Sequence, residues 1–140
     1  MVKFVIGPSG SGKTKWLIDE ANTEKANGNG NIVFIDTDDS HIYSLDHKVR
    51  LINANKYHIN SVNGFYGFLA GIISRDYDIE KVYVDGIYDI VDISVEELAT
   101  LSEELSALSE EFHVEFYIGL NKEKSELPEH MAESSIELTL

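Results

Sequence analysis

The sequence predicts an α/β fold in which helices cover both faces of a mostly parallel sheet of about five strands. Three observations support this fold class. Short apolar runs alternate with segments of helical periodicity, and a glycine-rich loop joins the first apolar run to the first helical segment. The chain of 140 residues suffices for one three-layer core but not for two, so we expect residues 1–140 to form a single domain.

The first half of the chain contains three predicted strands and one predicted helix. Apolar residues 2–6 predict a buried strand, and the segment from Lys15 to Gly28 has helical character without an interrupting Gly or Pro. A turn of Asn and Gly follows at residues 27–31. The run 32–35 predicts a buried strand with Asp36 at its tip, and residues 37–48 predict a loop. Residues 49–53 form a shorter, partly polar run, which favours a strand near the sheet edge.

The second half continues the alternation of helix and strand. A helix is predicted from Ser61, a strand at 81–85 and a strand at 114–118, while Ser94 and Glu97 form a capping box before another helix. The helix from Ser61 has an apolar face that consists of Val62, Phe65, Leu69, Ile72 and Ile73. The helix after Ser94 has an apolar stripe that consists of Leu98, Leu101, Leu105, Leu108 and Phe112. The alternation of Ile136, Leu138 and Leu140 predicts an additional C-terminal edge strand.

Charge and composition exclude several classes of function. Twenty-five acidic residues against 11 basic ones give a formal net charge of −14, which should repel a nucleic-acid backbone, so we expect no nucleic-acid partner. The absence of cysteine excludes disulfides, thiol nucleophiles and Cys-based zinc sites. Without a secretory leader pattern or an apolar run of membrane-spanning length, we expect a cytoplasmic protein with no membrane partner.

A phosphate-binding motif follows the first predicted strand. The pattern G-x-x-x-x-G-K-[ST] is matched at every fixed position by the run Gly7-Pro8-Ser9-Gly10-Ser11-Gly12-Lys13-Thr14. Glycines let successive N–H groups turn toward an anion, and the next helix points its positive dipole end at it. Lys13 should reach the β- and γ-phosphates, and the Thr14 hydroxyl should ligate Mg²⁺. An ordinary glycine-rich turn is the alternative, but the flanking strand and helix favour nucleotide binding by residues 7–15.

On these residues the chain resembles the P-loop NTPases. The order of its predicted elements resembles the RecA-like core of thymidine kinases over residues 1–121, without their zinc ribbon and substrate lasso, so nucleoside kinase activity is not implied. The chain is also similar to small uncharacterised bacterial P-loop proteins that sometimes carry a twitching-motility ATPase label. That activity is poorly supported because arginine fingers and a second domain are missing. The resemblance implies ATP or GTP and Mg²⁺ as cofactors.

Two further polar residues, Asp85 and Asn121, resemble positions of this family, and a third could substitute for a missing glutamate. Asp85 resembles the Walker B carboxylate that orients Mg²⁺, although it could instead cap the following turn. Gly86 stands where many hydrolytic relatives carry glutamate, and Asp89 is the nearest substitute as a catalytic carboxylate, unless it faces solvent in a turn. Asn121 resembles a polar sensor at the tip of a strand expected between the P-loop and Walker B strands. A simple turn asparagine is the alternative.

The segment from Phe34 to Asp38 resembles the acidic acceptor site of shikimate-kinase-like small-molecule kinases. Asp36 and Asp38 would then hold an acceptor hydroxyl, whereas a helix cap or Asx turn is the alternative. Arg50 and Arg75 are the only arginines, which argues against an arginine clamp or finger. The histidines show no metal-ligand spacing, and we interpret them as surface or loop residues. They are His41, His47, His58, His113 and His130.

These residues together predict a Mg²⁺-dependent ATP- or GTP-binding protein with slow hydrolysis, or a nucleotide-dependent switch for an unknown protein partner. A kinase that uses Asp36 and Asp38 at its acceptor site is the first alternative. A protein that binds a phosphate-bearing ligand without turnover is the second.

Overall fold

The computed structural model of the chain describes residues 1–28 and 30–139. The predicted turn at residues 27–31 includes Asn29, and the predicted C-terminal alternation includes Leu140, and both residues lie outside the described ranges. None of the helices within these ranges combines the length and apolar character that crossing a membrane requires.

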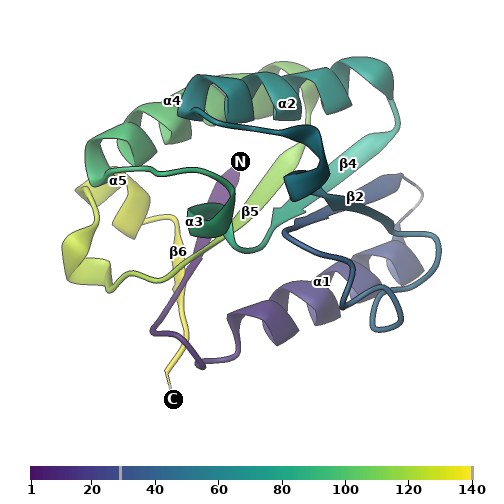
Figure 1. Cartoon of the computed structure of the whole chain (residues 1–140), viewed down its shortest axis with the longest axis horizontal. Coiled ribbons are helices and arrows are strands. Elements are labelled where there is room, and N and C mark those ends of the chain that lie inside the picture. Colours follow the sequence, from purple (N-terminus) through teal and green to yellow (C-terminus); the bar gives the residue numbers. More distant parts are fainter. Residues whose placement is uncertain (29, 140) are drawn as a thin grey trace.

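The described strands form one sheet of six, all parallel, in the order β3-β2-β4-β5-β1-β6 (Figure 1). Their bounds are β1 (Val2–Ile6), β2 (Asn31–Asp36), β3 (Arg50–Asn53), β4 (Ile79–Val84), β5 (Glu115–Leu120) and β6 (Ser135–Glu137). The prediction of an α/β fold with a parallel sheet is confirmed, with six strands instead of about five. The additional C-terminal strand lies at one edge and the short strand β3 at the other, as the sequence predicts.

Helices cover both faces of the sheet, which gives three layers (Figure 1). The helices are α1 (Lys13–Asn27), α2 (Val62–Arg75), α3 (Ile87–Ile90), α4 (Val95–Phe112) and α5 (Glu129–Ala132), with 3₁₀ turns at Ala54–Tyr57 and Lys124–Glu126. Helix α1 packs on one face, whereas α2 and α4 lie side by side on the other. The three long helices were predicted, and the one-turn helices α3 and α5 were not.

Alternation along the central strands explains why their sequences are mostly apolar. In β1, Phe4 and Ile6 belong to the core beneath α2 and α4, whereas Val5 belongs to the core beneath α1. In β4, Val84 and Tyr83 divide in the same way. A parallel strand that is covered on both faces needs apolar residues at every position. Each such Val, Leu, Ile or Phe contributes about 1.5–3 kcal/mol by its burial.

Helix α4 begins as predicted but ends differently. The Glu97 N–H donates to Ser94 Oγ and the Ser94 N–H to Glu97 Oε1, both at 3.1 Å, which completes the capping box. The predicted leucine stripe is buried, but the prediction for Phe112 is wrong because this last residue of α4 is 50% exposed. Ser109, three residues earlier in α4, is buried, and its hydroxyl accepts a hydrogen bond from the amino group of Met1.

The parallel arrangement brings the residues after the strands to one edge of the sheet. The glycine-rich loop follows β1, Thr37 follows β2, Asp85 follows β4 and Asn121 follows β5. These four strands are adjacent in the order β2-β4-β5-β1. Crevices at the carboxyl ends of parallel strands are the usual ligand sites of open α/β sheets. The fold therefore gathers the polar residues that the sequence singles out at one place.

Candidate functional site

A cavity of about 750 Å³ opens at the carboxyl ends of β1, β2, β4 and β5. The predicted site residues that line it are Ser9, Gly10, Gly12, Lys13, Thr14, Lys15, Asp36, Asp38, Asp85, Asp89 and Asn121. Gly7 and Pro8, at the start of the loop, border a second cavity of about 450 Å³ beside the C-terminal segment. Ser11 contacts the Lys13 ammonium through its hydroxyl. Residues from distant parts of the sequence therefore meet in one cavity.

The glycine-rich loop owes its path to two of its glycines. Gly12, which caps α1, has a φ of +93°, in the left-handed region that side chains disfavour. A Cβ on Gly7 would lie 2.6 Å from the carbonyl oxygen of Leu138, a backbone atom that cannot move aside easily. The Leu138 N–H donates to the Ile6 carbonyl at 2.8 Å, which holds the C-terminal segment against the start of the loop.

The Lys13 side chain lies inside the loop that precedes it. Its Nζ donates to the carbonyls of Gly7 and Pro8 at 2.8 and 2.7 Å and to Ser11 Oγ at 3.3 Å. Lys13 is only 9% exposed. Burial lowers the pKa of its ammonium, and the negative charge of Asp85 opposes that shift. The loop therefore encloses a cation at the N-terminus of α1, where the helix dipole also favours anions.

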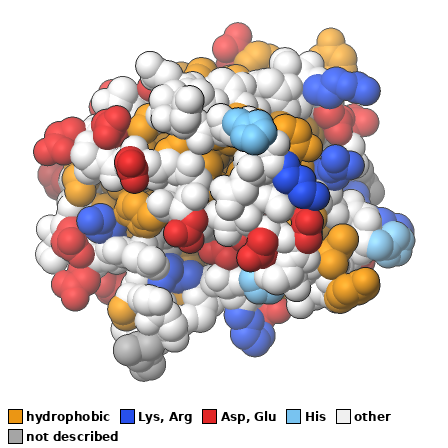
Figure 2. All heavy atoms as spheres, viewed as in Figure 1, with side chains coloured by type: hydrophobic (Ala, Val, Ile, Leu, Met, Phe, Trp, Pro, Cys, Tyr) orange, Lys and Arg blue, Asp and Glu red, His pale blue; other side chains and the backbone are white. Residues whose placement is uncertain are grey.

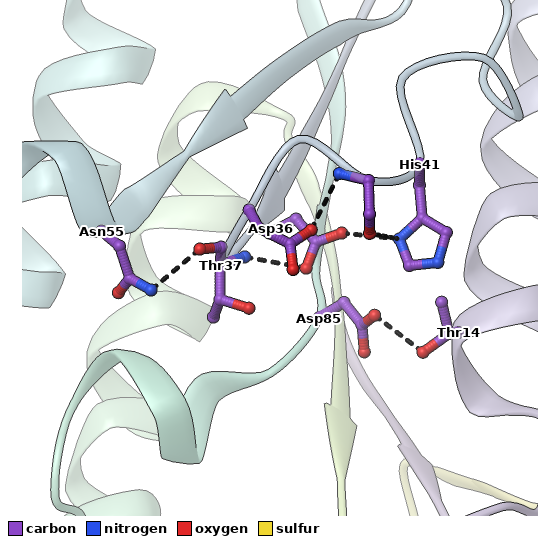
Figure 3. A network of polar contacts seen from close by, with 8 residues as sticks. Thr14, Asp36, Thr37, His41, Asn55 and Asp85 are labelled. Carbon is purple, nitrogen blue, oxygen red and sulfur yellow. Dashed lines mark hydrogen bonds and ion pairs between the residues drawn. The ribbon is translucent and has the colours of Figure 1, made fainter.

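Thr14 and Asp85 are in direct contact although 71 positions separate them (Figure 3). The Thr14 hydroxyl donates to Asp85 Oδ2 at 2.8 Å. Burial raises the pKa of Asp85, and the nearby charge of Asp36 raises it further, whereas the hydrogen bond from Thr14 lowers it. Hydroxyl and carboxylate oxygens are ligands that suit Mg²⁺. The two residues that the sequence assigns to the metal thus present their oxygens at one point.

Asp36 is buried at the tip of β2 and holds a histidine. Its Oδ1 accepts the Thr37 N–H at 2.8 Å, and its Oδ2 lies 3.0 Å from His41 Nδ1 (Figure 3). Asp38 is exposed, and the Ser40 hydrogen bonds to its carboxylate lower its pKa. The turn interpretation therefore accounts for Asp38 better than for Asp36, which is buried and contacts His41.

His41 changes our interpretation of the histidines. It lies in the predicted loop, but its side chain is 36% exposed, lines the cavity and pairs with Asp36. Asp36, Asp38 and His41 each offer one ligand atom within 4.8 Å of the others. Because Nδ1 already bonds to Asp36 and Asp38 bonds to the Ser40 N–H, we treat this group as a hydrogen-bonded pair beside a turn. The sequence carried no pattern that singled His41 out.

The remaining predicted residues lie at the rim of the cavity. Asp89 is exposed, as in the turn alternative, but it lies in the short helix α3, and Asn121 is exposed after β5. The Lys15 ammonium pairs with Asp19 at 2.6 Å on the outer surface of α1. Gly119, which was not predicted, also lines the cavity, and a Cβ there would lie 3.3 Å from Leu17 Cδ1. Its small size lets α1 approach β5 closely.

Comparison with known proteins adds no assignment to this site: neither a scan against protein-family models nor a search of curated proteins gave a match. A function for this chain therefore has to be inferred from the geometry and the chemistry of its own residues.

Proposed function

We propose that this protein is a P-loop nucleotide-binding protein that binds ATP or GTP together with Mg²⁺ and hydrolyses the nucleotide slowly. The contact of 2.8 Å between Thr14 Oγ1 and Asp85 Oδ2 carries the proposal. The sequence assigns both residues to Mg²⁺ on separate grounds, one as the end of the glycine-rich motif and one as a strand-end carboxylate. Their meeting beside the loop that encloses Lys13 supports a joint role in binding a metal–triphosphate complex.

The phosphate groups would lie between the loop and the start of α1. Backbone N–H groups of the loop, the dipole of the 15-residue helix α1 and the Lys13 ammonium would then share the negative charge. The position of β5 between β1 and β4 supports the likeness to the RecA-like core, in which Asn121 would contact the nucleotide as a sensor.

We propose slow turnover because no glutamate directly follows Asp85 and, among the described residues, the lining of the cavity contains no arginine. Gly86, next to Asp85, has a φ of +77°, and a Cβ there would lie 3.1 Å from Thr37 Cγ2. A glutamate at this position would therefore be strained. Arg50 and Arg75 are exposed, at the start of β3 and the end of α2, and neither lines the cavity. A protein partner could supply a missing group, so a nucleotide-dependent switch is part of this proposal.

Phosphate transfer to a small hydroxylated molecule is a second candidate function. The observation that favours it is that Asp36, 4% exposed, lines the same cavity as Lys13 and Asp85. A buried carboxylate beside the γ-phosphate position could hold an acceptor hydroxyl. The cavity of about 750 Å³ has the size of a small-molecule site.

The test of the proposal is a nucleotide screen followed by a turnover assay. Calorimetry with ATP, GTP and their non-hydrolysable analogues, with and without Mg²⁺, would identify the ligand. Phosphate release by the isolated protein is expected far below the roughly 10 s⁻¹ median of enzymes. An acceptor that increases nucleoside diphosphate without increasing free phosphate would favour the kinase. Failure of every nucleotide to bind would refute both functions.

A further inference from the structure

We propose that His41, oriented by Asp36, accepts the proton of the O–H group that attacks the γ-phosphate. This inference rests on the proposed function and adds a catalytic residue to it. The attacking group is either water or the alcohol of an acceptor molecule, since both present the same O–H to the base.

The pairing with Asp36 fixes one side of the imidazole and leaves the other available. His41 Nδ1 lies 3.0 Å from Asp36 Oδ2, and the Asp36 side chain is 6% exposed, so its position is set by the surrounding protein. A carboxylate only accepts hydrogen bonds, so Nδ1 carries the hydrogen and the lone pair lies on Nε2. A base oriented by a third group in this way is a recurrent arrangement in catalysis.

His47 provides an internal comparison on the same loop. Its Nδ1 lies 3.6 Å from Asp46 Oδ1, and its side chain is 87% exposed, compared with 36% for His41. Only His41 of these two lines the cavity with Lys13 and Asp85. The loop therefore contains two His–Asp pairs. The His47–Asp46 pair lies at the surface, whereas the His41–Asp36 pair lines the cavity, so His47 is a suitable control for His41.

The groups around His41 suit a residue that becomes cationic during the reaction. The charges nearby are the carboxylates of Asp36 at the end of β2, Asp38 in the loop and Asp85 at the end of β4, with Lys13 of α1 across the same cavity. The carboxylates would stabilise the imidazolium that forms on proton uptake. Asp89 is less suited to the same role because it is exposed at the rim.

The proton balance of the step is complete without a further reagent. The oxygen of water or of the alcohol forms a bond to the γ-phosphorus, and its proton moves to His41 Nε2. The bond between the γ-phosphorus and the β–γ bridging oxygen breaks, and its electron pair remains on the nucleoside diphosphate. The imidazolium, held by Asp36, then releases the proton to solvent. General base catalysis of this kind is worth about 10²–10⁴-fold in rate.

The experiment measures single turnovers of γ-labelled nucleotide by excess protein between pH 5 and 9. Each measurement is made once in buffer alone and once with added glycerol as the probe alcohol. Free phosphate measures transfer to water, and glycerol phosphate measures transfer to the alcohol. The variants are His41→Gln, Asp36→Asn and, as the matched control, His47→Gln. Calorimetry on each variant checks that nucleotide affinity is retained.

We expect His41→Gln to lower both rates by about 100-fold, and to remove the decline of the rate toward acidic pH that a base must show. Asp36→Asn should lower the rate by about 10-fold because the imidazole loses its orientation. His47→Gln should stay within a factor of about two, as a change outside the site should. A His41→Gln protein with the unchanged rate and pH profile would overturn the inference while nucleotide binding stood. Bound nucleotide without transfer to either acceptor would overturn it too, whereas absence of binding would refute the proposed function itself.

Discussion

Replacing Lys13 with alanine tests the proposed phosphate site most directly. Lys13 Nζ donates to the carbonyls of Gly7 and Pro8 at 2.8 and 2.7 Å, and on nucleotide binding it would exchange these partners for phosphate oxygens. Two opposite unit charges about 4 Å apart attract by about 4 kcal/mol at an effective dielectric constant near 20. Giving up two hydrogen bonds of about 1 kcal/mol each offsets half of this. We expect a net loss of about 2 kcal/mol, which is about a 30-fold weaker Kd.

Calorimetry with the Mg²⁺ complexes of non-hydrolysable ATP and GTP analogues measures this loss. Trp16, near the loop and 6.2 Å from the Tyr117 ring by centroids, should report the same binding by fluorescence. Lys48→Ala is the charge-matched control, because Lys48 is exposed and does not line the cavity. Equal affinities of the Lys13→Ala variant and the unchanged protein, with a folded circular dichroism spectrum, would show that the loop does not bind phosphate.

The cavity residues and the surface charge lead to four other expected outcomes. Asp85→Asn should leave metal-free nucleotide binding intact and abolish most of its Mg²⁺ dependence, and identical Mg²⁺ titrations would show that Asp85 is only a turn cap. Burial raises the pKa of Asp85, so stability is lost as pH rises through that pKa; Asp85→Asn should therefore raise Tm at neutral pH, with a gain that shrinks on acidification. Unassisted hydrolysis should remain far below about 10 s⁻¹; fast release would contradict this and would point to a base in addition to His41, with Asp89 the first to replace. Acidic side chains lie among the basic ones on the face in Figure 2, and the net charge is −14, so we expect no binding of DNA or RNA, and a salt-sensitive micromolar complex would contradict this.

The sheet and the glycine-rich loop between β1 and α1 were predictable because their signals are local. The central residues 32–35 of β2 are buried on both faces of the sheet and are all apolar, so this run could be recognised without knowledge of its neighbours. The last three residues of β4, 82–84, are buried and apolar in the same way. The capping box at Ser94 uses residues three positions apart. Asp85 was identifiable as a strand-end carboxylate, and the contact with Thr14 then followed from parallel strands ending at one edge.

Predictions failed where a distant segment decided the outcome. Phe112 continues the spacing of the leucine stripe, but α4 ends there and Ser109 meets the amino group of Met1, 108 positions away. The one-turn helices α3 and α5 are too short for helical periodicity to show in the sequence. Their apolar residues Ile87, Ile90 and Met131 are buried because they pack on the sheet, which the local pattern does not reveal.

The contact of His41 with Asp36 is local in sequence but could not be predicted from a local pattern. It is only five positions from Asp36, yet no regular element relates them, since residues 37–48 form a loop whose turns decide which side chains meet. Three features of the fold produce the contact: the tip of β2 buries Asp36, the Ser40 N–H bonds to Asp38, and the chain reverses to bring the imidazole over the cavity. Asp38 thus influences the position of His41 by stabilising the turn of the loop, whereas Asp36 contacts the imidazole directly with its carboxylate. The acidic segment that suggested an acceptor site from sequence also holds a histidine at the cavity in three dimensions, and the proposed catalytic role of His41 depends on this contact with Asp36.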